Sequence, residues 1–328
     1  MSASHQPLAS VSLDLDNQWS YMKTHGDAGW SEFPSYLDVV VPRVLDFLKQ
    51  RGLTITFFIV GQDAALARNE RALASIATAG HEIGNHSFHH EPWLHRYTPE
   101  EIEAEIESAE EHIERVTGRR PLGFRGPGFS ISPTVLGVLA RRGYRYDAST
   151  FPTFIGPLAR AYYFMTSRLS KAELEQRRAL FGGFAEGFRP IRPYRWQTSA
   201  GELIEIPVTT MPLLRLPIHV SYLLYIAGVS PKLARAYFRA ALSLCRLRGV
   251  QPSLLLHPLD FLGRDDGTGL DFFPGMRLPS QRKMELVSMA LEELSQSYEI
   301  VTMQHHAASI SVGALSVASV ARAGLAQG

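Results

Sequence analysis

Apolar and polar residues alternate at the start of the chain, and a longer segment with helical spacing follows. In residues 11–16 the apolar positions alternate with a serine and two carboxylates, Asp14 and Asp16. The two-residue period of a strand places both carboxylates on one face. Across residues 36–52 apolar side chains recur at helical intervals, and Gly52 stands where such a helix would end. The pattern therefore predicts a strand followed by a helix.

The alternation of strand and helix continues along the chain. The clearest helix signal is Thr98-Pro-Glu-Glu101, a capping box with proline at the first helical position, before an apolar stripe that ends at Gly118. Further strands are predicted at 53–60, 81–86, 122–125, 144–148, 203–208, 253–257 and 299–303, with helices near 72–80, 133–142, 231–248 and 281–296. About seven to eight strand and helix pairs predict an α/β fold with a parallel barrel.

Two segments interrupt this alternation. Residues 151–200 contain a double glycine and several prolines, and residues 211–229 are apolar but broken by prolines. We expect both to be inserted lid segments on the barrel. The predicted organisation is a single catalytic domain over residues 1–306, followed by a flexible tail at 307–328.

Composition narrows the choice of partner and compartment. Lys plus Arg (33) nearly equals Asp plus Glu (32), so no nucleic acid partner is expected. Cys245 is the only cysteine, which excludes an intramolecular disulfide. The first residues do not resemble a signal peptide, and the charge and prolines of 211–229 make it a poor spanning helix. A cytoplasmic location is therefore expected.

The residues best suited to chemistry fall at or just beyond predicted strand ends, where parallel barrels carry their active sites. They are Asp14, Asp16, His86, Arg125, Asp147 and His257. One carboxylate with two imidazoles is a ligand set typical of catalytic zinc, and Asp14 is a second carboxylate beside it. Each residue alone also suits a structural role, such as a loop cap or an ion-pair partner. Their shared position at strand ends favours a common site.

Five short motifs follow one another along the chain. They are Leu13-Asp-Leu-Asp16, His86-Ser-Phe-His-His90, Phe124-Arg-Gly-Pro-Gly-Phe129, Tyr146-Asp-Ala-Ser149 and Leu254-Leu-Leu-His-Pro258. In this order the motifs resemble those of the polysaccharide deacetylases, the NodB-like carbohydrate esterases. The resemblance covers roughly residues 8–150 and 200–305. It implies a deformed (β/α) barrel and metal-dependent removal of N- or O-acetyl groups from sugars.

The resemblance also implies roles for the residues around a metal ion. Asp16, His86 and His90 correspond to the ligands of one divalent metal. Zn²⁺ is the expected ion, with Co²⁺, Mn²⁺ and Ni²⁺ as alternatives. Such an ion lowers the pKa of water and polarises the amide carbonyl. Asp14 corresponds to the general base, and Arg125 to the arginine that keeps this base ionised and oriented.

The remaining roles concern the departing group and the oxyanion. His257 corresponds to the general acid, and Asp147 to the carboxylate that aligns its ring. The backbone N–H near Gly128 corresponds to the oxyanion donor. Here the chain departs from the family, which usually has an aromatic residue after the motif-three proline, whereas this chain has Gly128 followed by Phe129. Leu15 also separates two aspartates that are commonly adjacent, and strand alternation still places both on one face.

Some assignments have alternatives. His89 could take the place of His90 as a ligand, although the family spacing favours His90. Trp19, Tyr21 and Phe129 are candidate substrate contacts, since flat aromatic faces suit sugar rings, and packing in the core or lid is an equal alternative for the first two.

The resulting hypothesis is a metal-dependent hydrolase that removes an N-acetyl group from an amino sugar in a glycan or glycan precursor. A cytoplasmic location favours a nucleotide-linked, oligosaccharide or lipid-linked substrate. Segment 211–229 would then dock a lipid tail or the inner membrane face, or simply pack as a cap or dimer contact. The alternatives are a deformylase or another amidase, and an inactive sugar-binding module. The sequence does not indicate the sugar, its carrier, the native metal or the oligomeric state.

Overall fold

The computed structural model describes residues 6–156, 183–273, 275–310 and 315–319 of the chain. Within them, all eight predicted strands are present. They are β1 (Leu8–Asp14), β2 (Thr56–Ile59), β3 (Glu82–Asn85), β4 (Gly123–Phe124), β5 (Tyr146–Asp147), β7 (Gly201–Glu205), β8 (Ser253–Leu256) and β9 (Glu299–Val301). Each strand overlaps the segment in which it was expected, and β1 and β7 begin earlier than predicted.

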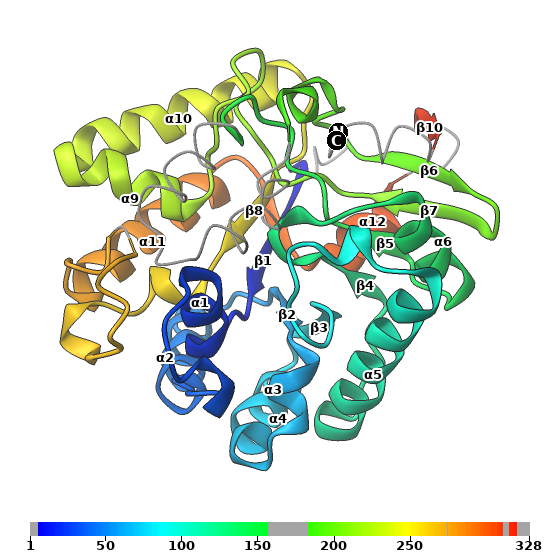
Figure 1. Ribbon diagram of the computed structural model, residues 1–328. Coiled ribbons are helices and arrows are strands. Elements are labelled where there is room, and N and C mark those ends of the chain that lie inside the picture. Colours follow the sequence, from blue (N-terminus) through cyan, green and yellow to red (C-terminus); the bar gives the residue numbers. More distant parts are fainter. Residues whose placement is uncertain (1–5, 157–182, 274, 311–314, 320–328) are drawn as a thin grey trace.

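The predicted helices surround these strands (Figure 1). They are α2 (Leu37–Lys49), α4 (Glu70–Thr78), α5 (Pro99–Thr117), α6 (Pro133–Arg141), α10 (Pro231–Leu247) and α11 (Ser280–Ser295). Helix α5 begins with the predicted capping box, in which the Thr98 hydroxyl accepts from the Glu101 N–H and the Glu101 carboxylate accepts from the Thr98 N–H. Four further helices follow strands or precede α10 and were not predicted: α1 (Gln18–His25), α3 (Gly61–Ala65), α9 (Val220–Val229) and α12 (Met303–Ser309).

The strands form one mostly parallel sheet that curves into a deformed (β/α) barrel. With β6 (Tyr194–Thr198) and β10 (Val317–Ser319), its order is β10-β6-β7-β5-β4-β3-β2-β1-β8, and β9 pairs with β1. The chain beyond β7 reaches the other end of this order, because the Thr209 N–H donates to the Ser253 carbonyl at 3.0 Å and the Ser253 N–H donates to the Thr209 hydroxyl at 2.7 Å. These two bonds join the segment that follows β7 to β8 and bring the two sides of the sheet together.

The predicted insertion at 151–200 is only partly an insertion. Its last residues form β6 (Tyr194–Thr198), which pairs antiparallel with β7 and therefore belongs to the sheet. The segment was read as irregular because an arginine- and proline-rich run precedes it. Residues 157–182 of the same prediction lie outside the described residues.

The described part of the predicted tail contains regular secondary structure, which was not expected. Helix α12 continues through residues 307–309, and β10 (Val317–Ser319) pairs parallel with β6. In segment 211–229, the chain turns and then forms α9, which packs against α10 and α11. No helix among the described residues combines the length and the apolar character needed to cross a bilayer.

The two faces of β1 show how the barrel is filled. Ala9, Val11 and Leu13 pack outward into the largest apolar cluster, which also contains residues of the surrounding helices. The opposite face carries Ser10, Ser12 and Asp14, as the alternation predicts.

Helix α12 contributes to the core that the interior strands form. Met303 and Ala307 pack in one cluster with Phe58, Tyr146 and Ile206. The ring of His306 is buried and bonds to Ser10 and Gln251. Both of its ring nitrogens therefore have polar partners inside the barrel.

Candidate metal centre and active site

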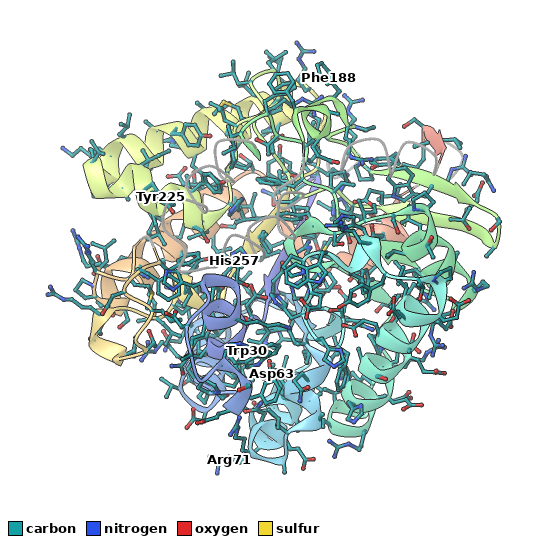
Figure 2. The ribbon with its side chains drawn as sticks, in the orientation of Figure 1. Trp30, Asp63, Arg71, Phe188, Tyr225 and His257 are labelled. Carbon is teal, nitrogen blue, oxygen red and sulfur yellow. The ribbon has the colours of Figure 1, made fainter. Side chains whose placement is uncertain are left out.

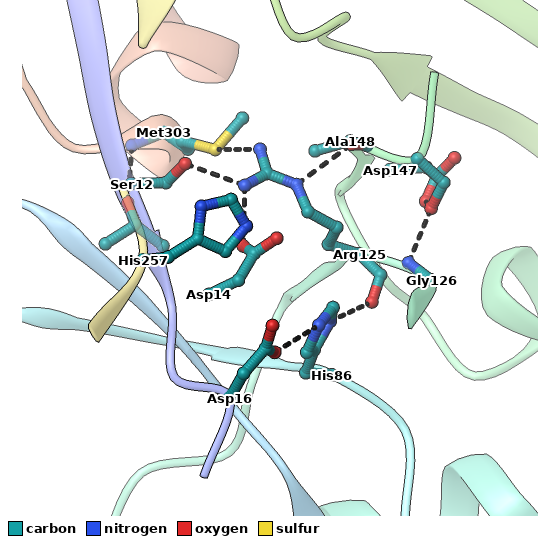
Figure 3. A network of polar contacts seen from close by, with 12 residues as sticks. Ser12, Asp14, Asp16, His86, Arg125, Gly126, Asp147, Ala148, His257 and Met303 are labelled. Carbon is teal, nitrogen blue, oxygen red and sulfur yellow. Dashed lines mark hydrogen bonds and ion pairs between the residues drawn. The ribbon is translucent and has the colours of Figure 1, made fainter. Parts of the chain in front are cut away.

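The chemically active side chains lie together at the C-terminal ends of the strands (Figure 3). Asp14 is the last residue of β1, whereas His86, Arg125 and His257 each follow the last residue of their strands. Leu13 and Leu256 are register partners on β1 and β8, so Asp14 and His257 follow on neighbouring strands. The strand-end geometry expected from the sequence is thus present.

The side chains of Asp16, His86 and His90 come together near these strand ends. Asp16 Oδ1 lies 3.0 Å from His90 Nε2 and 3.3 Å from His86 Nε2. The ligand atoms of all three side chains lie within 4.8 Å of one another, which makes the group suitable for a metal ion. The structure therefore brings together the ligand set predicted from the sequence.

The hydrogen bonding of His86 supports this interpretation. His86 Nδ1 lies 2.6 Å from the Arg125 carbonyl oxygen, which can only accept, so Nδ1 donates. In the neutral ring, Nε2 then directs a lone pair at Asp16. A lone pair that faces a carboxylate requires a proton or a cation between them. Metal-binding histidines are usually oriented in this way, by a hydrogen bond from the ring nitrogen that does not bind the metal.

The charges of the cluster point the same way. Burial favours the neutral carboxyl of Asp16, but the rings of His90 and His86 outweigh burial and hold its pKa well below the usual range. Burial disfavours the charged ring of His86, yet Asp14 and Asp16 raise its pKa above the usual value. Asp16 and the His86 ring therefore stabilise each other's charged forms. A divalent cation fits the donor set of one carboxylate and two imidazoles.

In the loop after β3, the side chains of the adjacent residues His89 and His90 point in different directions. Glu105 of α5 accepts from the backbone N–H of Phe88 and of His89, at 3.1 and 2.6 Å, and bonds the His89 ring at 2.7 Å. The His89 side chain is 57% exposed and turned toward α5. His90 adopts a left-handed backbone (φ 54°) that directs its ring toward Asp16. The geometry favours His90 as the ligand.

Arg125 and Asp14 form a buried ion pair. Arg125 Nη1 donates to Asp14 Oδ1 at 2.7 Å and to the Ser12 hydroxyl at 2.8 Å, and its Nε donates to the Ala148 carbonyl at 3.0 Å. The guanidinium also lies over the Phe58 ring, 4.5 Å from its centroid. Every part of this side chain is fixed, so Arg125 is suited to hold the Asp14 carboxylate in one orientation.

His257 has partners that sequence analysis did not identify. Its Nδ1 lies 3.2 Å from the Ser221 hydroxyl of α9, and that hydroxyl donates to Asp260 Oδ1 at 3.0 Å. Asp260 stands three residues after His257, behind a proline, which is a local turn signal that could have been noticed. Ser221 lies in the segment interpreted as a lid, and no sequence signal connects it to His257.

Asp147 lies in another environment. Its Oδ1 accepts from the Ser149 hydroxyl at 2.6 Å, and it pairs in register with Glu205 across β5 and β7. Burial and the neighbouring Asp147 hold the pKa of the Glu205 carboxyl well above its usual range. These contacts link Asp147 to β7. The predicted role of Asp147, the alignment of the His257 ring, stays a prediction.

The predicted substrate contacts differ in accessibility. Trp19 is only 1% exposed, its indole N–H donates to Asp63 at 2.9 Å, and its ring packs against Phe33. A sugar cannot stack on a ring that is covered in this way, so the role predicted for Trp19 does not fit the structure. Tyr21 is partly buried, with its ring 5.3 Å from that of Phe273.

The turn after β4 holds the remaining candidates. Phe129 is partly buried and stacks on Phe151 at 4.9 Å between ring centroids. Gly128 is exposed, and a side chain there would meet Pro92 in the loop that follows His90. Its backbone is left-handed (φ 57°), which glycine adopts without strain. The oxyanion role of Gly128 stays a prediction.

The fold and the site together define a class: an α/β barrel with a candidate metal centre at the C-terminal ends of its strands. Residues 26–146 match the family model described as polysaccharide deacetylase. Over this part, the chain is similar to the polysaccharide deacetylases. The matched range contains His86, His90 and Arg125, whereas Asp14 and His257 lie outside it.

Curated relatives agree with this family. A peptidoglycan-N-acetylmuramic acid deacetylase of Bacillus subtilis is 36% identical over 111 residues, 34% of this chain and 41% of the relative. A peptidoglycan-N-acetylglucosamine deacetylase of Bacillus cereus is 33% identical over 140 residues, 43% of this chain and 61% of the relative. A chitooligosaccharide deacetylase of Azorhizobium caulinodans is 34% identical over 111 residues, 32% of this chain and 50% of the relative. The chain thus spans less than two thirds of each of these relatives.

A solved structure shares the fold over nearly the whole chain. It is a protein of Mycobacterium smegmatis assigned to the polysaccharide deacetylases, with a TM-score of 0.62 and 20% identity, covering 97% of this chain and 95% of that one. At this identity the likeness shows the fold.

Proposed function

We propose that this protein is a metal-dependent hydrolase that removes an N-acetyl group from an amino sugar in a glycan or a glycan precursor. The observation that carries the proposal is the convergence of Asp16, His86 and His90 beside the Asp14–Arg125 ion pair. The match of residues 26–146 to the polysaccharide deacetylase model and the deacetylases among the relatives support the reaction class.

The residues divide the chemistry between two sides of the amide. When bound, a divalent cation at Asp16, His86 and His90 supplies an activated water and a polarised carbonyl. Asp14 takes a proton from the attacking water, and the bond from Arg125 holds its carboxylate in place for this step. His257, on the neighbouring strand, donates a proton to the departing nitrogen. Zn²⁺ is the proposed metal because two imidazoles and one carboxylate suit it.

The test is a direct assay of acyl release. Purified protein loaded with Zn²⁺ is incubated with N-acetylated chitooligosaccharides, peptidoglycan fragments and nucleotide-linked N-acetyl sugars, and both acetate and formate are measured. We expect acetate from at least one substrate, loss of release with a chelator, and recovery when zinc is restored. Formate from an N-formyl sugar in place of acetate would support a deformylase instead.

Two variants make the assay specific to the site. Asp14→Asn removes the base and is expected to abolish release while retaining zinc, whereas Asp46→Asn makes the same chemical change on the exposed face of α2. Sugar binding without release in the wild-type protein would support an inactive sugar-binding module. Equal release by wild type and Asp14→Asn would contradict the proposal.

We further propose a cytoplasmic protein that contacts a lipid-linked substrate or the inner membrane face. The support is a set of apolar side chains exposed on segment 211–229: Leu213 (62%), Leu214 (60%), Tyr225 (50%) and Val229 (83%). In Figure 2, Tyr225 lies on the outer part of the molecule and His257 near its centre. Deletion of the segment would also remove Ser221, so point variants are the better test.

Liposome flotation with vesicles of phosphatidylglycerol and phosphatidylethanolamine measures this contact. We expect wild type to float with the vesicles and the Leu213→Ser/Leu214→Ser double variant to float less. Equal flotation of both proteins would remove the membrane proposal and leave the deacetylase proposal intact, because neither residue belongs to the metal centre.

A further inference from the structure

We propose that Ser221 and Asp260 are the positioning residues of His257, and that together they fix which nitrogen of its ring faces the substrate. The inference rests on the proposed function, in which His257 donates a proton to the departing nitrogen. Helix α9, which lies in a segment that the sequence pattern predicts to be a lid, would then help to orient the general acid. Asp260 would likewise take the aligning role that the family resemblance implies for Asp147.

The contacts form a closed loop of three residues. The Ser221 hydroxyl, in the first turn of α9, lies 3.2 Å from His257 Nδ1 and 3.0 Å from Asp260 Oδ1. The other oxygen of Asp260 accepts from the His257 backbone N–H at 2.8 Å. Asp260 is fully buried, and the Asp260 N–H donates back to the His257 carbonyl at 2.9 Å. One carboxylate therefore holds both the backbone and, through Ser221, the ring of His257.

The direction of the hydrogen bonds follows from the number of protons. A serine hydroxyl has one hydrogen, and an ionised carboxylate can only accept, so the Ser221 hydrogen points to Asp260. The Ser221 oxygen is then left to accept from His257 Nδ1–H. Nε2 of His257 is consequently the nitrogen available to the substrate.

This arrangement suits a general acid. In the charged ring both nitrogens carry hydrogen, and Nε2–H gives its proton to the departing nitrogen as the carbon–nitrogen bond breaks and its electron pair stays on that nitrogen. The ring that remains is neutral and keeps Nδ1–H, which the Ser221 oxygen accepts. The same hydrogen bonds therefore fit the ring before and after proton transfer.

Several charged or titratable groups face this trio. His219, the N-cap of α9, has its ring centroid 6.1 Å from that of His257. Burial, followed by His257 and Arg125, lowers the pKa of His219 well below the usual value, so it stays neutral across the working range. Lys283 of α11 donates to the Leu259 carbonyl at 2.8 Å. Asp14 follows on the neighbouring strand.

Asp260 itself is subject to opposing effects. Burial raises the pKa of the Asp260 carboxyl above its usual value, while His257, its backbone N–H, Ser221 and Lys283 favour the ionised form. Replacing Asp260 by asparagine removes the negative charge at constant shape. The profile of activity against pH should then respond, which a purely structural role would not produce.

The first experiment measures kcat and KM for acetate release against pH in the zinc-loaded full chain. Ser221→Ala and Asp260→Asn should lower kcat by about tenfold or more with KM nearly unchanged, because only the acid is misplaced. Asp260→Asn should move the basic limb of the kcat profile to lower pH by about one unit. Ser221→Thr should restore most of the rate, and Ser243→Ala, an exposed change on α10, should match wild type.

The second experiment needs no substrate. In zinc-loaded protein labelled with ¹⁵N-histidine, the ring nitrogen shifts of His257 at high pH should show the Nδ1–H form in wild type and a mixture of both forms in Ser221→Ala. Asp147→Asn should leave the Nδ1–H form unchanged.

The outcomes separate this inference from the proposed function. A wild-type protein that releases no acyl group would overturn the proposed function, while the ring nitrogen shifts would still test the hydrogen bonds. Active wild type, with the pH profile and the Nδ1–H form unchanged in Ser221→Ala and Asp260→Asn, would overturn the inference alone. A change in Asp147→Asn instead would return the aligning role to Asp147.

Discussion

The metal side of the candidate site, Asp16, His86 and His90, and its acid side, His257, are held in place by different parts of the chain. On the metal side, the loops directly after β1 and β3 supply the ligands, and the Arg125 carbonyl and Glu105 orient the second loop. On the acid side, His257 follows β8 in the same way, but its ring is held by Ser221 from α9, 36 residues earlier in the chain.

The comparison shows that the position of a chemical group and the orientation of its side chain can depend on different parts of the chain. The barrel framework brings together the C-terminal ends of β1, β3 and β8, so the ligands and the acid occupy similar positions. The orientation of the acid depends on a segment outside the repeated pattern. Damage to the metal side should therefore remove the chemistry, whereas damage to the acid side should slow it.

Loss of a ligand should have the largest effect. Asp16→Ala and His86→Ala each remove one of three protein ligands and leave the buried remainder of the cluster without its partner. We expect loss of bound zinc together with a fall in kcat/KM of about 10³-fold or more, since such an ion contributes several kcal/mol. Zinc content by mass spectrometry of the metal and acyl-release kinetics check both. His89→Ala is the control, and full zinc content in His86→Ala would contradict the ligand set.

Loss of the base should separate metal binding from turnover. Asp14→Asn keeps the size of the side chain but cannot take a proton, so kcat should fall by about 10²- to 10⁴-fold while zinc content stays at the wild-type level. The measurement is the ratio of kcat to bound zinc in the same preparation. Loss of zinc in parallel with activity would show that Asp14 belongs to the ligand set.

Loss of the buried arginine should reduce stability as well as activity. Arg125→Met leaves Asp14 and Ser12 without their buried donor. Breaking such a pair costs about 3 kcal/mol or more in the free energy of unfolding, because one charge stays buried and unpaired. Denaturant unfolding of the metal-free protein measures this cost. Arg141→Met, which breaks an exposed pair with Glu103, should change stability by less than about 1 kcal/mol.

Asp63 supports the metal side and should give it a pH dependence. It accepts from Asn17 at 2.7 Å and from Trp19 at 2.9 Å, and both belong to the chain just after Asp16. Burial raises the pKa of the Asp63 carboxyl to about 7. The folded state therefore binds a proton more tightly than the unfolded state, in which an aspartate titrates near about 3.9.

The sign of this effect is fixed by proton binding. Between about pH 4 and pH 7 the folded state holds the extra proton, so stability falls as pH rises, by at most about 1.4 kcal/mol per pH unit. Asp63→Asn keeps an oxygen acceptor and cannot ionise, so the difference in stability between wild type and Asp63→Asn should change steadily across that window. Denaturant unfolding at several pH values measures the difference. A constant difference would show that Asp63 is ionised throughout.

The strands and the metal side could be predicted because local patterns encode them. Apolar runs that end at polar residues mark the strands, and the two-residue period puts Ser12 and Asp14 on the face where both bind Arg125. The spacing of His86 and His90 lets both rings reach Asp16 from one loop. Each of these features depends on residues that are close in sequence.

The parts that were missed depend on residues far apart. Ser221 and Asp260 are separated by 39 positions, and nothing near either of them indicates a shared hydrogen bond. His306 looks exposed from its neighbours, but the barrel interior supplies Ser10 and Gln251 as partners. Trp19 was a candidate for sugar contact by its chemistry alone, and its bond to Asp63 could not be anticipated. Tertiary contacts of this kind have no local pattern.

The proposed function depends on one divalent cation bound by Asp16, His86 and His90. Crystals of the zinc-loaded protein, with diffraction recorded on both sides of the zinc absorption edge, would locate this ion. We expect one strong anomalous peak at bonding distance from the Asp16 carboxylate and from Nε2 of both histidines. A peak elsewhere, or no peak from protein that still releases acetate at the full rate, would contradict it.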